Sequence, residues 1–191
     1  MGSILSFLGY NKKVRILLLG LDNSGKTTFL HMLNNWDHRH IAPTIYPKTV
    51  EYVHGSTTCE LIDCTSRYNS ASAYNRINST AGVQNNFSHN FGKILFCYQA
   101  IIFLIDGHDD ERLEEGIALL QSTLNLSNEN TSVLLFVNKI DRCATKPALD
   151  LITKITFPDR VVIQYGSAVK NVDLKEGFDK LLELHDRKHG L

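Results

Sequence analysis

A glycine-rich octapeptide, G-L-D-N-S-G-K-T at residues 20–27, has the residue types and the spacing to hold phosphate groups. Glycines at both ends let the backbone curl so that successive N–H groups point inward, and the dipole of a following helix favours the same negative charge. Lys26 would reach the β- and γ-phosphates, and the Thr27 hydroxyl would bind Mg²⁺. The residues expected to hold the phosphates are the following: Asp22, Asn23, Ser24, Gly25, Lys26, Thr27 and Thr28.

Two further residues are placed to complete a magnesium site with Thr27. Thr44 could put its hydroxyl on Mg²⁺ and its N–H on the γ-phosphate, so that its loop orders only when that phosphate is present. Asp63 follows a β-rich run and could hold Mg²⁺ through water. The nearby pair His38 and His40 is not expected to bind zinc, because two histidines in a polar loop beside a cationic residue are more often solvated.

The tetrapeptide N-K-I-D has the groups that recognise guanine. Asp141 could accept two hydrogen bonds from the N1–H and N2–H₂ edge of the base, whereas adenine would leave a buried carboxylate unpaired. Asn138 would brace the loop, and Lys139 would lay its stem along the base. A backbone N–H of the later G-S-A tripeptide, which contains Ser167 and Ala168, could reach the guanine O6. The sequence therefore predicts binding of GTP and GDP.

A parallel sheet is needed to bring these motifs together. Short apolar runs alternate with segments of helical periodicity, which predicts an α/β fold whose sheet is mostly parallel and six-stranded, with helices on both faces. Strands are expected at residues 14–19, 49–53, 57–62, 100–106, 132–137 and 161–164. Helices are expected at residues 26–34, 91–98, 111–124, 147–155 and 174–185. The motifs then follow strands, at the carboxyl-terminal edge where open α/β sheets bind ligands.

Composition narrows the class of protein. With 191 residues and 43% hydrophobic content, the chain suits one domain with a sizeable core. Twenty basic and twenty acidic residues give a formal net charge of zero, so no nucleic-acid partner is expected. The four cysteines have no C-x-x-C pair, as is typical of reduced thiols. No apolar run approaches the roughly 18 residues of a membrane span, so we expect a cytoplasmic protein without a transmembrane helix. A monomer in solution is also expected.

The first residues form a separate functional segment. Residues 1–13 are predicted to be an amphipathic membrane-binding segment, because the apolar side chains of residues 4–8 gather on one side of a helix and lysines follow. Gly2 and Ser6 also fit the pattern for N-myristoylation, although one acyl chain binds a bilayer with only about 10⁴ M⁻¹. The alternative is a frayed chain end, since a helix this short is marginal in water.

The order of these motifs resembles that of the Arf/Sar family of small GTPases in the Ras superfamily. The motifs are the phosphate loop, P-T-I, the strand-end Asp63, N-K-I-D and G-S-A. The chain is most similar to the Sar branch, which starts COPII coat assembly at the endoplasmic reticulum. The resemblance implies a P-loop small GTPase domain at residues 14–191. It also implies a membrane switch in which the N-terminal segment enters the bilayer when the hairpin of residues 49–62 shifts. The same resemblance implies three protein partners: an exchange factor, a GTPase-activating protein and a coat effector. It also implies a location on endoplasmic reticulum or Golgi membranes and a role in transport between them.

One segment departs from the family pattern. Where the family has D-x-G-G and then a water-orienting His or Gln, this chain has D-C-T-S-R and a polar insertion at about residues 64–90. Arg67 stands at the water-orienting position, but a guanidinium has only donors. The Cβ of Ser66 restricts the close approach to phosphate that a glycine allows. Slow GTP hydrolysis is therefore expected, unless Gly82 and Gln84 fill these roles instead.

Three functional interpretations remain open on the sequence alone. The first is a slow Sar-type GTPase that acts in vesicle budding. The second is a nucleotide-binding scaffold that no longer hydrolyses GTP. The third is an Arf-like myristoylated GTPase with a different membrane and effector.

Overall fold

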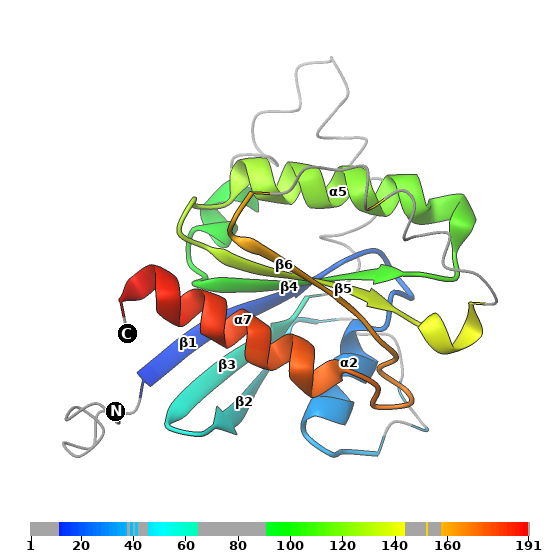
Figure 1. Cartoon of the computed structure of the whole chain (residues 1–191), viewed down its shortest axis with the longest axis horizontal. Helices are drawn as coiled ribbons and strands as arrows, with labels where there is room; N and C mark the ends of the chain where they lie inside the picture. Colours follow the sequence, from blue (N-terminus) through cyan, green and yellow to red (C-terminus); the bar gives the residue numbers. More distant parts are fainter. Residues whose placement is uncertain are drawn as a thin grey trace.

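Six strands form one sheet, in the order β2-β3-β1-β4-β5-β6 (Figure 1). The computed structural model describes residues 12–37, 39, 41, 46–64, 91–143, 152 and 158–190. The strands are β1 (Lys12–Leu19), β2 (Lys48–His54), β3 (Thr57–Asp63), β4 (Ala100–Asp106), β5 (Ser132–Asn138) and β6 (Val161–Tyr165). All neighbouring strands are parallel except β2 and β3, which form an antiparallel hairpin. The predicted six-stranded, mostly parallel sheet is confirmed.

Helices cover both faces of this sheet (Figure 1). They are α2 (Lys26–Leu33), α5 (Leu113–Leu126) and α7 (Leu174–His189), with the 3-10 turns η2 (Asp110–Arg112) and η3 (Ile140–Arg142) and a helical turn at residues 91–95. The apolar side of α5 packs on one face, and α2 and α7 pack on the other. Central β4 and β5 are therefore buried on both sides, which explains their continuous apolar sequences.

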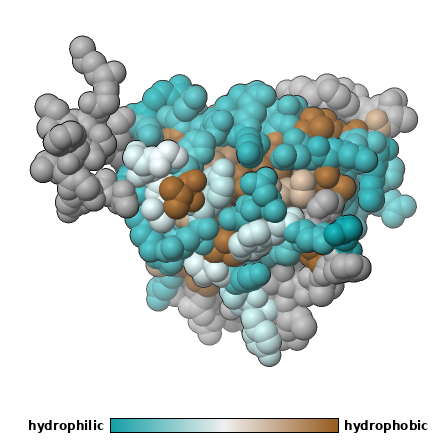
Figure 2. All heavy atoms as spheres, turned by 90° about the horizontal axis from the view of Figure 1, so that it is seen from below, coloured by the Kyte–Doolittle hydropathy of each residue, from teal (hydrophilic) through white to brown (hydrophobic). Residues whose placement is uncertain are grey.

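The edge strand β2 differs from the central strands in its burial. Its residues are mostly exposed, and Val53 keeps 68% of its surface accessible. Figure 2 shows a mainly hydrophilic surface on the side viewed from below, with hydrophobic residues in small separate patches. Among the helices that the structure describes, none combines the length and the apolar character needed to cross a membrane.

Several predicted segments lie wholly or mostly outside the described residues. They include the membrane-binding segment of residues 1–13, apart from the start of β1, and the insertion at about residues 64–90. The helix predicted at 147–155 is represented only by residue 152, which is helical. The site residues Thr44, Ser66 and Arg67, and the histidine pair His38 and His40, are also outside the described part of the chain.

Candidate functional site

The loop between β1 and α2 needs glycine at both ends. Gly20 has φ +133°, and a Cβ there would lie 2.1 Å from the carbonyl oxygen of Leu104. Gly25 has φ +95°, and its Cβ would lie 2.3 Å from Asn138 Nδ2. Both positions combine a left-handed backbone with a close neighbour, so any larger residue would strain the loop. The loop therefore has the tight curl that phosphate binding requires.

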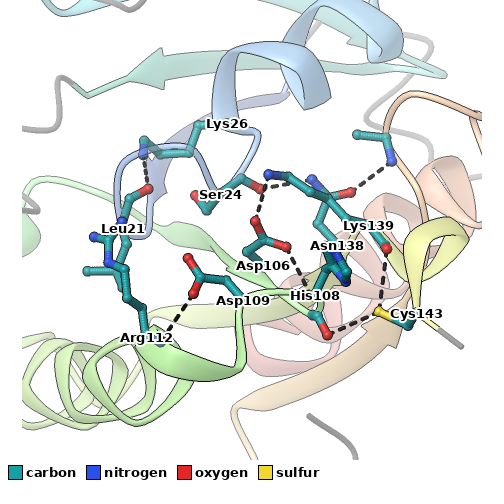
Figure 3. Close-up of polar contacts among 12 residues, drawn as sticks. Leu21, Ser24, Lys26, Asp106, His108, Asp109, Arg112, Asn138, Lys139 and Cys143 are labelled. Atoms are coloured by element: carbon teal, nitrogen blue, oxygen red, sulfur yellow. Dashed lines mark hydrogen bonds and ion pairs between the residues drawn. The ribbon is translucent and has the colours of Figure 1, made fainter. Parts of the chain in front are cut away.

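Lys26 folds back over this loop (Figure 3). Its Nζ donates hydrogen bonds to the carbonyl oxygens of Gly20, at 2.9 Å, and Leu21, at 2.7 Å. The residue is only 7% exposed. Burial lowers the pKa of the Lys26 ammonium to about 8, although the charges of Asp63 and Asp22 oppose the shift. An anion in the loop would favour the charged form of Lys26 and thus offset the cost of its burial.

The first turn of α2 contacts the end of β3. The Thr27 hydroxyl donates a hydrogen bond of 2.7 Å to Asp63 Oδ2. Asp63 is 1% exposed, so its carboxylate is enclosed beside the phosphate loop. A hydroxyl and a carboxylate are hard oxygen ligands of the kind that Mg²⁺ prefers. The structure thus brings together two of the three predicted magnesium ligands, and their chemistry fits that ion.

Asn138 links the phosphate loop to the other end of the site. Its Nδ2 donates to the carbonyl oxygen of Ser24 at 2.8 Å, and its Oδ1 accepts from the backbone N–H of Ala168 at 2.9 Å. Asn138 is the last residue of β5 and is 2% exposed. One buried amide therefore fixes the G-S-A turn and the phosphate loop relative to each other.

The G-S-A turn uses two of its backbone N–H groups within the fold. The Ala168 N–H is given to Asn138, and the Ser167 N–H is given to the carbonyl oxygen of Val172 at 3.1 Å. These donors hold the shape of the turn, and the N–H contact of the turn to guanine O6 stays a prediction. Binding of O6 there would need a shared donor or a small shift of the turn.

The base-recognition loop begins with a left-handed residue. Lys139 has φ +63°, and its Nζ contacts Asp106 Oδ2 at 2.6 Å, with both side chains 14% exposed. The chain then enters η3, where the Asp141 carboxylate is exposed. Asp141 is therefore accessible to an incoming base, and the Lys139 side chain is held by Asp106.

Two residues that the sequence did not assign to the site also contact it. Asp106 ends β4 and lies opposite Asn138 in the register of β4 and β5. Arg112 Nη2 contacts Asp22 Oδ1 at 2.6 Å, within the phosphate loop. Asp106 could have been predicted as a site residue, because the sequence shows an acidic residue at the end of β4. Nothing in the sequence pattern pointed to Arg112.

Comparisons with known proteins all lead to the same protein family. A model of the ADP-ribosylation factor family matches residues 1–68 and 82–185, which leaves residues 69–81 of the polar insertion unmatched. The small COPII coat GTPase SAR1 of Giardia intestinalis is 35% identical over 141 residues, or 73% of this chain. This chain spans only 65% of that protein's length.

Arf-like proteins are similar over more of their length. ADP-ribosylation factor-like protein 3 of Caenorhabditis elegans is 30% identical over 173 residues, covering 87% of this chain and 84% of that protein. Human ADP-ribosylation factor-like protein 4C is 26% identical over 190 residues, covering 96% and 93%. The structure of the Arl6 BBS3 small GTPase from Trypanosoma brucei, with the bound nucleotide analogue GppNp, has a TM-score of 0.69 and 22% identity. The two structures match over 93% of this chain and 99% of the Arl6 chain, so they have the same fold.

Proposed function

The chain belongs to the ADP-ribosylation factor family of small GTPases, and on this premise we propose that it is a GTP-binding membrane switch of the Sar type. In this proposal it recruits a COPII-like coat for vesicle budding from the endoplasmic reticulum. The observation that carries the nucleotide-binding part is the Asn138 amide, which holds Ser24 of the phosphate loop and Ala168 of the base-side turn at once. A nucleotide has phosphates at one end and a base at the other, so it can contact both of these segments at once.

Each half of the site then has a defined task. Lys26 and the curled backbone of the phosphate loop would hold the phosphates. Thr27, Thr44 and Asp63 would hold Mg²⁺, which neutralises phosphate charge when bound. Asp141 would accept hydrogen bonds from the guanine edge, with Lys139 along the base. These residues bind and orient the nucleotide without forming a covalent bond to it.

The Sar assignment is supported by the 35% identity to the Giardia coat GTPase, and membrane binding is supported by the apolar pattern of residues 1–13. We expect the full chain to float with liposomes when loaded with a non-hydrolysable GTP analogue, and to bring purified COPII coat proteins with it. A form that starts at Lys12 should stay in solution. It keeps all of β1, including the ion pair of Lys12 with Asp186, so its loss of flotation would not reflect damage to the fold.

Flotation has two outcomes that contradict the proposal. Equal flotation of the full chain and the shortened form would remove the N-terminal anchor. Flotation of the full chain without the coat proteins would favour the Arf-like alternative, which the 93% coverage of human ADP-ribosylation factor-like protein 4C supports. Mass analysis for an acyl group on Gly2 tests that alternative separately.

We also propose that intrinsic hydrolysis is slow, because Arg67 cannot accept a hydrogen bond from the attacking water. In single-turnover assays of orthophosphate release, the rate should rise for Arg67→His and stay unchanged for Gln84→Ala. A substantial rate in the unmutated protein that Gln84→Ala abolishes would show that the insertion supplies the water-positioning group. No release in any variant would favour the scaffold interpretation.

A further inference from the structure

The phosphate loop carries a carboxylate, Asp22, which is unfavourable next to phosphate anions. Lys26 contributes one positive charge to this loop, and an ionised Asp22 cancels it in the net charge. Lys26 also donates hydrogen bonds to two loop carbonyl oxygens. A loop with no net charge would attract a polyanion weakly, so the charge of Asp22 needs another partner.

Arg112 is that partner. Its Nη2 lies 2.6 Å from Asp22 Oδ1, and its Nε lies 3.2 Å from Glu115 Oε2 on α5. The hydrogen bond from Arg112 lowers the pKa of Asp22. The same contact raises the pKa of Arg112.

The position of Arg112 is fixed by its own backbone. The Asp109 carboxylate accepts a hydrogen bond from the Arg112 N–H at 3.2 Å and caps η2. Arg112 then leads directly into α5. A residue anchored at the start of a buried helix loses little additional freedom when it forms an ion pair, which favours a persistent contact.

The ion pair joins the phosphate loop to the segment before α5, and both line one small pocket. Leu21, Asp22 and Ser24 line this pocket from the loop, and Asp109 and Arg112 line it from the segment before α5. Figure 3 shows the Arg112 side chain beside Leu21, with the Asp109 carboxylate directed at the Arg112 backbone. Leu21 packs with Leu113 and Ile117 in one buried cluster, so the Asp22 contact lies beside a packed interface.

We propose that Arg112 is a positioning residue of the nucleotide site, which neutralises Asp22 and holds its carboxylate toward α5 so that the loop can accept phosphates. The inference rests on the proposed function in one respect, because it takes a guanine nucleotide as the ligand. Without Arg112, Asp22 would face the phosphates as an uncompensated charge. With it, the charge of Asp22 is compensated and the charge of Lys26 can act on the phosphates.

The test is a double-mutant cycle on the full chain, with a fluorescent GDP derivative as the probe. Arg112→Met should weaken GDP binding about 10-fold, and more at low ionic strength, because the unpaired Asp22 then repels the phosphates. Asp22→Asn should bind GDP at least as tightly as the unmutated protein. In the double variant, Arg112→Met should add less than about a 2-fold loss to Asp22→Asn.

Glu115→Gln is the matched control, because it removes the negative charge of the second partner of Arg112 without touching the loop. It should change GDP affinity by less than about 2-fold. Thermal unfolding of each variant without nucleotide checks that α5 still forms.

The inference is overturned if Arg112→Met weakens GDP binding equally with and without Asp22→Asn, since Arg112 would then act on phosphate directly or through helix structure. An unchanged affinity in Arg112→Met also overturns it. In both cases, GDP binding by the unmutated protein would leave the proposed function standing. Failure of the unmutated protein to bind GDP would overturn both.

Discussion

Replacing Asn138 by alanine is expected to remove most of the nucleotide affinity and roughly 2–5 kcal/mol of the free energy of unfolding. The substitution deletes two hydrogen bonds of a side chain that is 2% exposed. It also leaves the carbonyl oxygen of Ser24 and the N–H of Ala168 buried without that partner, and each such group costs about 1–3 kcal/mol. The phosphate loop and the base-side turn would then no longer be held at a fixed separation.

Two measurements separate these effects. Urea unfolding without nucleotide gives the loss of stability, and the dissociation rate of fluorescent GDP gives the loss at the site. Asn125→Ala on the exposed side of α5 is the control, and it should stay within about 0.5 kcal/mol of the unmutated protein. An Asn138→Ala variant that unfolds and releases GDP like this control would show that the amide bridge does not hold the site together.

The fold was largely predictable because the strand signals are local. β4 coincides with its predicted range, since a continuous apolar run bounded by polar residues determines both ends. Helix ends were less predictable. α7 continues to His189, beyond the predicted end at residue 185. The prediction stopped early because the last turn of the helix is charged and lacks apolar periodicity. Gly190, at φ +65°, ends the helix in the left-handed conformation, and this C-terminal signal was present in the sequence.

The start of α5 shows a second limit of periodicity. A helix was predicted from residue 111, but the chain first forms the 3-10 turn η2, capped by the Asp109 carboxylate. Apolar spacing identifies the buried face of a helix and says little about its first turn, where capping hydrogen bonds decide the geometry. This turn is what places Arg112 beside the phosphate loop.

Site residues within a motif were predictable, whereas their partners from other elements were not. The contact of Thr27 with Asp63 follows from two adjacent parallel strands that end beside one loop. The contact of Lys139 with Asp106 depends on the register of β4 and β5, which the sequence does not specify. The hydrogen bond from the Ala168 N–H to Asn138 Oδ1 was not predictable, because the sequence does not show that these two residues lie close together.

Asp141→Asn is expected to change the base preference of the site from guanine to xanthine. The carboxylate would accept hydrogen bonds from the N1–H and N2–H₂ groups of guanine, and an amide can accept only one of them. Each hydrogen bond to a charged group contributes about 1.5–3 kcal/mol, so the loss of one of them should lower GDP affinity roughly 10–10²-fold. Xanthine has a carbonyl in place of the exocyclic amine, and the new amide can donate to it.

Competition against fluorescent GDP measures the change, with unlabelled GDP, xanthosine diphosphate and ADP as competitors. Asp141 is exposed in η3, so its replacement should leave the unfolding free energy nearly unchanged, and the effect can be assigned to the ligand. Asp110→Asn makes the same change of charge at an exposed position in η2 and should keep the preference for GDP. If Asp141→Asn bound GDP as tightly as the unmutated protein, or if ADP competed equally with GDP before any substitution, Asp141 would not be the residue that reads the base.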